Sequence, residues 1–196
     1  MEGLKKNNRV QLLSIVVIGA LTCICILLIL QNKELKASFR NSSPFLFESL
    51  KPGDKVESVT VQSLNGATIS LRYQEPEQKY LLFIFSTTCP HCENNLPIWN
   101  HIANLVGNKS GLNIIGIASE PLEVLNSFVK NKNPDFNICS AITDTSFGRK
   151  YGINVVPETI ILTGDGTVIK TWIGELHGIQ TEEVQTLLMG DSQSSN

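Results

Sequence analysis

Two cysteines that stand two residues apart are the strongest chemical signal in this sequence. Cys89 and Cys92 enclose a proline and a histidine, Pro90 and His91. An apolar run of strand length ends at residue 85, and apolar residues recur at helical spacing after the second cysteine. A thiol at a helix start is stabilised as a thiolate by free backbone N–H groups and the helix dipole. The pattern therefore predicts a redox pair, in which Cys89 attacks a disulfide and Cys92 resolves the mixed disulfide.

The two residues between the cysteines are expected to tune this chemistry. Pro90 restricts the loop, and His91 can place a positive charge or a hydrogen-bond donor near the Cys89 sulfur. Stabilising the thiolate stabilises the reduced form, which moves the couple toward oxidising potentials. The alternative for His91 is an exposed spacer without an electrostatic role.

A zinc site is the main alternative for a Cys-x-x-Cys pair, because structural zinc takes four ligands. The sequence has no second pair of this spacing, and His101 and His177 stand isolated. We therefore predict redox chemistry without a metal, and with no cofactor beyond the Cys89–Cys92 disulfide. Cys139 falls in a predicted strand and is expected to be a buried, small apolar residue.

A proline near the start of an apolar run is the second element of the predicted site. Pro157 lies within residues 155–162, which have the composition of a buried strand. Proline cannot donate to a strand ladder, so it needs an edge position or a special geometry. A cis bond between Val156 and Pro157, beside the cysteine pair, provides that geometry. The alternative is an ordinary trans proline at a sheet edge.

The rest of the pattern alternates strands and helices. Apolar alternation around Asn65-Gly66 predicts a β-hairpin near the start of the domain. Five further strands are predicted, at residues 80–85, 114–118, 136–142, 155–162 and 168–173. Helices are predicted after Cys89, after Pro121, before Gly152 and after Thr181, which is expected to cap the last one. This order predicts an α/β fold with a central mixed sheet flanked by helices.

Residues 10–30 are the apolar concentration of the chain, with no charged side chain. A helix of that length spans roughly 31 Å, which matches the hydrocarbon core of a bilayer. A cleaved signal peptide is the alternative, but its apolar region is shorter and ends in a small-residue cleavage site. We therefore expect one transmembrane helix, with residues 1–9 in the cytoplasm and residues 31–50 as a stalk. Cys23 and Cys25 would then be lipid- or helix-facing thiols.

The charge of the chain is unevenly distributed. Residues 1–40 carry six basic and two acidic residues, whereas residues 41–196 carry ten basic and sixteen acidic residues. A negatively charged domain repels a phosphate backbone, so nucleic acid is not expected as a partner. Five cysteines in 196 residues are also too few for a disulfide-stapled scaffold.

The sequence resembles the TlpA/ResA/DsbE branch of membrane-anchored, thioredoxin-fold thiol–disulfide oxidoreductases. Cys89-Pro90-His91-Cys92 matches the active-site motif, and Pro97 matches the proline that kinks the active-site helix. Tyr151-Gly152-Ile153 is similar to the family's approach to its cis-proline, and Pro157-Glu158-Thr159 is similar to the DsbE pattern. The hairpin and an extra strand–helix unit match as well. The resemblance covers about residues 50–190.

The resemblance implies a thioredoxin-like domain over residues 51–190, followed by a flexible tail over residues 191–196. It implies disulfide exchange with partner proteins, an upstream membrane thiol reductant or oxidant, and a role as a reductant in cytochrome c or enzyme maturation. The backbone of Val156 and Pro157 would face an extended partner segment. In this branch the domain lies outside the cytoplasm, so we expect it on the periplasmic or outer face of the cell membrane.

The proton acceptor for Cys92 does not follow from the family's own positions. Phe83 stands where thioredoxin has a buried aspartate, and Asn95 stands where ResA has a glutamate. Glu158, which follows Pro157, is the remaining candidate, and the alternative is a solvated carboxylate at a strand edge. The Cys-Pro-His-Cys motif also resembles oxidising DsbA-type sites, so the direction of electron flow stays open.

Three other functions remain open at this point. A copper chaperone on the same fold would use His177 as a distal ligand, although such proteins usually carry a Cys-x-x-x-Cys motif. A peroxiredoxin-like peroxidase would need a proline and a threonine where this chain has Leu82 and Ser86. A binding protein without redox work would keep its role when Cys89 is removed.

Overall fold

The computed structural model describes residues 17–31, 33, 47–107 and 109–189. The chain separates into two compact units, Met1–Leu46 and Phe47–Asn196. Some predicted segments lie outside the described residues, namely the N-terminus at 1–9, most of the stalk and the tail at 191–196.

In the N-terminal unit, residues 17–31 are helical and their side chains are exposed. The predicted anchor at residues 10–30 begins before this helix, in a part of the chain outside the described residues. Among the described residues, no helix is both long enough and apolar enough to cross a membrane. The anchor therefore stays a prediction.

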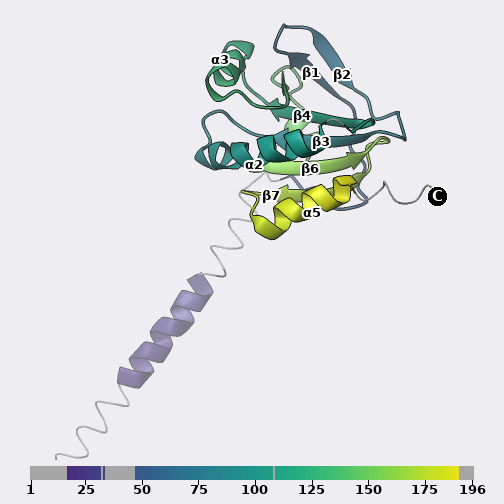
Figure 1. Cartoon of the computed structure of the whole chain (residues 1–196). Helices are drawn as coiled ribbons and strands as arrows, with labels where there is room; N and C mark the ends of the chain where they lie inside the picture. The colour runs from purple at the N-terminus through teal and green to yellow at the C-terminus, as the bar shows by residue number, and fades with distance from the viewer. Residues whose placement is uncertain (1–16, 32, 34–46, 108, 190–196) are drawn as a thin grey trace, which may run out of the picture. The chain divides into compact units, whose positions relative to one another are not determined.

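The second unit is built on one sheet, as Figure 1 shows. Its described strands have the order β2-β1-β5-β4-β3-β6-β7. The bounds are β1 Val59–Ser63, β2 Thr68–Leu71, β3 Lys79–Ile84, β4 Leu112–Ala118, β5 Asn137–Ser140, β6 Glu158–Thr163 and β7 Val168–Ile173. Strand β4 runs parallel to β3 and β5, whereas β1, β6 and β7 pair antiparallel. The prediction of a mixed sheet is confirmed.

Helices cover both faces of this sheet. Their bounds are α2 Pro90–Val106, α3 Leu122–Lys132, α4 Phe147–Lys150 and α5 Gly178–Met189. One core cluster joins buried side chains of α2, α3 and α5 to β3, and a second cluster joins α4 and the β1–β2 hairpin to the opposite face. The arrangement is the predicted α/β fold, with α2 lying across the centre of the sheet (Figure 1).

Strand β3 lies inside the sheet, between β4 and β6, and is buried on both faces. Leu81 and Phe83 face the cluster with α2, whereas Leu82 and Ile84 face the cluster with α4. Successive side chains of a strand point to opposite faces. A continuous apolar run is therefore the pattern that a doubly covered strand requires.

Trp99 fixes α2 against the sheet. Its side chain is buried, and its ring stacks on Phe83 with centroids 4.8 Å apart. Its Nε1–H donates to the Thr159 hydroxyl at 2.9 Å, so the indole's one polar atom is satisfied inside the core. These contacts fix the position of α2, the helix that begins at the cysteine pair, against β3 and β6.

The predicted hairpin is present between β1 and β2. Gly66 occupies the left-handed region with φ +86°, where a side chain would be strained. Its N–H donates to the Ser63 carbonyl at 2.8 Å, and the Asn65 side chain accepts the N–H of Ala67 at 3.0 Å. The Asn-Gly pair thus forms the turn expected from the sequence.

The largest differences from the predicted boundaries are at the starts of β6 and α5. Strand β6 begins at Glu158 rather than at residue 155, because Pro157 has no N–H to give to the ladder. The last helix begins at Gly178, so Thr181 lies inside it and does not cap it. The cap forms earlier because the Gln180 side chain accepts the N–H of His177 at 3.0 Å.

Candidate active site

The cysteine pair stands at the start of α2, directly beyond the carboxyl end of β3. Cys89 is the N-cap residue, with extended backbone, and Pro90 begins the helix. Proline suits this position because its missing N–H is one that the helix could not pair anyway. The N–H groups of Cys92 and Glu93 both donate to the Cys89 carbonyl at 3.1 Å. The first cysteine therefore lies where the helix dipole favours a thiolate.

The two thiols differ in accessibility. Both are free, and Cys89 is half-buried whereas Cys92 is 4% exposed. Burial is the main cause that raises the pKa of the Cys92 thiol to about 12, with smaller contributions from the nearby Cys89 and Glu120. Cys92 is thus held as a neutral thiol beneath the more accessible Cys89, the arrangement needed by an attacking and a resolving cysteine.

The bond between Val156 and Pro157 is cis, as the sequence predicted. The Cys89 thiol donates to the Val156 carbonyl over 3.6 Å, which is within range for sulfur. The carbonyl of Pro157 accepts the N–H of Gly174 at 2.8 Å. The cis-proline loop is therefore brought against the cysteine pair, and it is held there by the loop that follows β7.

The His91 side chain is 71% exposed. Its Nδ1 lies 2.5 Å from Oε1 of Glu175, and the Asn94 side-chain amide donates to the same oxygen at 3.1 Å. These hydrogen bonds lower the pKa of Glu175. Sequence reasoning missed Glu175 because it lies more than eighty residues from the motif, in a loop without a signature.

Glu158 is buried at the start of β6, so it is not a solvated strand-edge carboxylate. Burial raises its pKa to about 7, against the opposing effect of a backbone hydrogen bond from Asn154. Glu158 pairs with Ile84 and shares its sheet face with Ile160, in the cluster opposite the one that contains Cys92. The structure therefore does not bring Glu158 to Cys92, as the proton-acceptor hypothesis requires.

Glu120 is the carboxylate that faces the cysteine pair, and sequence reasoning missed it. It follows the carboxyl end of β4, which lies beside β3. Its Oε1 accepts the Ser86 hydroxyl at 2.6 Å and the Thr87 N–H at 3.0 Å. Glu120 thereby fixes the segment that leads from β3 to Cys89. A signal was available, because the carboxyl ends of neighbouring parallel strands meet at one edge of the sheet.

Neutral side chains occupy the two positions where the related families have acids. Phe83 lies in the core beneath α2. Asn95 is fully buried, and its Oδ1 accepts the N–H of Leu176 at 2.9 Å. Asn95 therefore connects α2 to the loop after β7 and cannot itself accept a proton.

The sequence profile of the Redoxin family matches residues 51–188. The chain belongs to the Redoxin family. This Redoxin is 29% identical over 143 residues to the thiol–disulfide oxidoreductase ResA of Halalkalibacterium halodurans. The matched region covers 70% of this chain and 77% of the relative. ResA of Bacillus cereus is 26% identical over 137 residues, covering 69% of this chain and 75% of the relative.

Solved structures show the same fold for this Redoxin. A thiol:disulfide interchange protein DsbE from Chlorobium tepidum superposes with a TM-score of 0.61 at 18% identity, covering 71% of this chain and 97% of the other. StoA from Bacillus subtilis superposes with a TM-score of 0.54 at 20% identity, and the match covers 66% of this chain and 94% of StoA. The predicted thioredoxin-like fold, the TlpA/ResA/DsbE resemblance and the enzyme class of thiol–disulfide oxidoreductase are confirmed.

A small cavity of about 270 Å³ adjoins the redox site of this Redoxin. Its wall includes Phe85, Ser86 and Glu120, together with Val156 of the cis-proline loop. Glu120 and the cis-proline loop thus share one hollow beside the strand that leads to Cys89.

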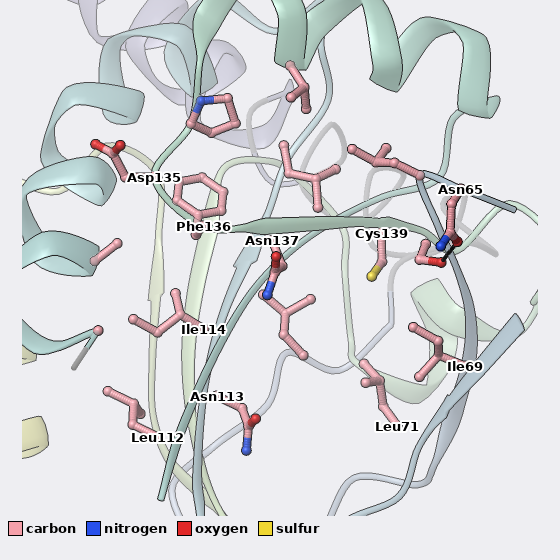
Figure 2. Close-up of a pocket in the computed structure, with 18 residues that line it drawn as sticks. Asn65, Ile69, Leu71, Leu112, Asn113, Ile114, Asp135, Phe136, Asn137 and Cys139 are labelled. Atoms are coloured by element: carbon pink, nitrogen blue, oxygen red, sulfur yellow. Dashed lines mark hydrogen bonds between the residues drawn. The ribbon is translucent and has the colours of Figure 1, made fainter. Parts of the chain in front are cut away.

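A larger cavity of about 980 Å³ is shown in Figure 2, and neither Cys89 nor Cys92 lines it. It lies among the β1–β2 hairpin, the start of β4 and β5, where Leu112, Phe136 and Cys139 are part of its wall. Leu112 pairs with Lys79 at the amino end of β3, opposite the end that leads to Cys89. Burial raises the pKa of Cys139.

In the part of the chain that the structure describes, no three His, Cys, Asp or Glu side chains lie close enough together to hold a metal ion. His177, the distal ligand that a copper site would need, stands in the loop before α5 with its N–H bound by Gln180.

Proposed function

We propose that this Redoxin is a membrane-tethered oxidoreductase that exchanges disulfides with partner proteins through Cys89 and Cys92. One observation carries the proposal. The accessible Cys89 thiol stands at the start of α2, 3.6 Å from the Val156 carbonyl of the cis-proline loop, with the buried Cys92 one turn behind it. This geometry serves a two-step thiol exchange.

In the reducing direction, the Cys89 thiolate attacks one sulfur of a partner disulfide. The partner's S–S bond breaks, a mixed disulfide forms, and the other partner sulfur leaves as a thiolate that takes up a proton. Cys92 then loses its proton and attacks the Cys89 sulfur, which closes the Cys89–Cys92 disulfide and releases the second partner thiol. Two electrons pass to the partner, and the same steps run backwards in the oxidising direction.

The cis-proline loop is the proposed contact for the partner. The Val156 carbonyl lies beside the Cys89 sulfur, so an extended segment aligned along Val156 and Pro157 would place its own cysteine next to that sulfur. We further propose a role as a reductant in cytochrome c or enzyme maturation, which the resemblance to the TlpA/ResA/DsbE branch implies, with an upstream membrane thiol partner that resets the Cys89–Cys92 pair.

A Cys92→Ser variant tests this mechanism. Without the resolving thiol, the first step stops at the mixed disulfide, so partner proteins should accumulate covalently bound through Cys89. Non-reducing electrophoresis of the full-length variant expressed in cells would show these adducts, and reducing agent should release them.

The double variant Cys89→Ser, Cys92→Ser is the matched control and should capture nothing. A Cys92→Ser protein that remains folded, as judged by thermal unfolding, yet forms no adducts would contradict the proposed exchange.

Residues 10–30 are proposed to tether the protein as a single-pass anchor, with the redox domain outside the cytoplasm. The length of the segment and its lack of charged residues support the anchor. The placement outside the cytoplasm is supported by the chemistry, because disulfides form and persist in oxidising compartments. Alkaline phosphatase fused at the C-terminus should be active, because it folds only outside the cytoplasm. An inactive phosphatase fusion, together with a fluorescent cytoplasmic reporter at the same position, would contradict this orientation.

A further inference from the structure

The loop between β7 and α5 joins the two halves of the redox site. At one end, the N–H of Gly174 donates to the carbonyl of Pro157 in the cis-proline loop at 2.8 Å. At the other end, the N–H of Leu176 donates to the buried Asn95 of α2 at 2.9 Å. Glu175 stands between these two fixed points, so its backbone is held next to the first turn of α2.

The Glu175 carboxylate is directed at that first turn. One oxygen, Oε1, receives both His91 Nδ1 at 2.5 Å and the Asn94 amide at 3.1 Å. The Glu175 side chain is 23% exposed, whereas that of His91 is 71% exposed. Glu175 is therefore the better fixed member of the pair, and it determines which way the imidazole points.

This pairing changes what the histidine can do for the neighbouring thiolate. A protonated imidazole that is free to approach Cys89 would stabilise the thiolate, and with it the reduced form. A carboxylate bound at Nδ1 cancels most of that charge and leaves only Nε2 to face other groups. His177, in the same loop, is the other titratable group whose charge acts on Glu175.

We propose that Glu175 is a positioning residue for the redox site. By binding Nδ1 of His91, it withholds the imidazolium charge from Cys89 and makes the couple less oxidising than its Cys-Pro-His-Cys motif alone would be. This inference rests on the proposed function, because it concerns the potential of the same cysteine pair.

The test is the equilibrium of the purified protein with glutathione at pH 6, where an imidazole side chain without a carboxylate partner is ordinarily protonated. The two thiols of Cys89 and Cys92 give two electrons and two protons to glutathione disulfide, which yields the protein disulfide and two molecules of glutathione. In Glu175→Gln the equilibrium constant for this oxidation should fall on the order of fivefold, the factor expected for one unit charge a few ångströms away at a solvent-accessible site.

Two controls separate this effect from a general change in charge or structure. Glu93→Gln also removes one negative charge, in this case from the first turn of α2. Because Glu93 binds Lys132 instead of His91, the equilibrium constant of this variant should differ less than twofold from that of the parent protein. In a His91→Gln background, Glu175→Gln should have less than half of its original effect, because the charge it releases is absent.

An equilibrium constant for Glu175→Gln within twofold of the parent protein would overturn the inference, and so would an undiminished effect in the His91→Gln background. The parent protein itself reports on the underlying function. If it forms no reversible Cys89–Cys92 disulfide with glutathione, the proposed function fails, whatever the variants do.

Discussion

Replacing Cys89 with serine is expected to lower the rate of disulfide exchange by at least about a thousandfold, because the reaction loses its nucleophile. The buried Cys92 cannot take over, since it is 4% exposed and its burial raises its pKa to about 12. Reduction of insulin disulfides, with dithiothreitol as the electron source, measures this rate, after subtraction of the rate without protein.

Cys139→Ala is the matched control for this experiment. Cys139 is also a free and buried thiol, but it lies on β5, two strands away from β3, in the core cluster on the sheet face opposite the cluster that contains Cys92. Its removal should leave the exchange rate within about twofold of the parent value, since small buried apolar changes act on stability rather than on a distant site. More than a tenth of the parent rate remaining in Cys89→Ser would mean that another thiol does the chemistry.

Glu158→Gln is expected to stabilise the protein at alkaline pH, by on the order of 2–3 kcal/mol at pH 8. Glu158 is buried in an apolar cluster, and among the described residues its Oε1 has no hydrogen-bond partner. Burial raises the pKa of its carboxyl from an ordinary value of 4.5 to about 7. Keeping a charge at this position therefore costs free energy that a neutral amide of the same shape avoids.

The sign of the pH dependence follows from proton binding. Between about pH 4.5 and pH 7 the folded state holds a proton on Glu158 that the unfolded state has lost. The contribution of Glu158 to the free energy of unfolding is therefore fully present below pH 4.5. It falls as the pH rises and is lost above about pH 7. In Glu158→Gln this decline should be absent.

Urea unfolding of the reduced protein at pH 4.5, 6 and 8 measures both effects. Parent and Glu158→Gln should have similar free energies of unfolding at pH 4.5 and should diverge toward pH 8. Glu77→Gln provides the control, because Glu77 is an exposed carboxylate near the start of β3. Equal unfolding midpoints for parent and Glu158→Gln at pH 8 would show that Glu158 carries its charge at no cost.

Much of the fold could be predicted because its signals are local. Strand β3 has an unbroken apolar run because it is covered on both faces, and the Asn-Gly pair forms its turn through contacts within five residues. The errors came at element ends. The cap of α5 depends on the Gln180 side chain reaching back to His177, a detail that composition around Thr181 does not reveal.

The core of the site was also readable from the sequence. A cysteine pair after a buried strand places a thiol at a helix start, and a proline within a strand pattern predicts a special geometry, which the cis Val156–Pro157 bond supplies. The role given to Glu158 did not follow in the same way. Its side chain lies on the sheet face opposite Cys92, and the exact first residue of β6 decides which face that is.

The sequence by itself thus determined the reactive groups: two thiols, the residues between them and the proline that faces them. Steric and hydrogen-bonding preferences of neighbouring residues encode these features, so they are visible in a short window. Only the tertiary structure decided which carboxylates lie beside this site. Glu120 reaches Ser86 and Glu175 reaches His91 from separate loops, because the order β4-β3-β6-β7 brings the ends of these strands together. No local pattern carries that information.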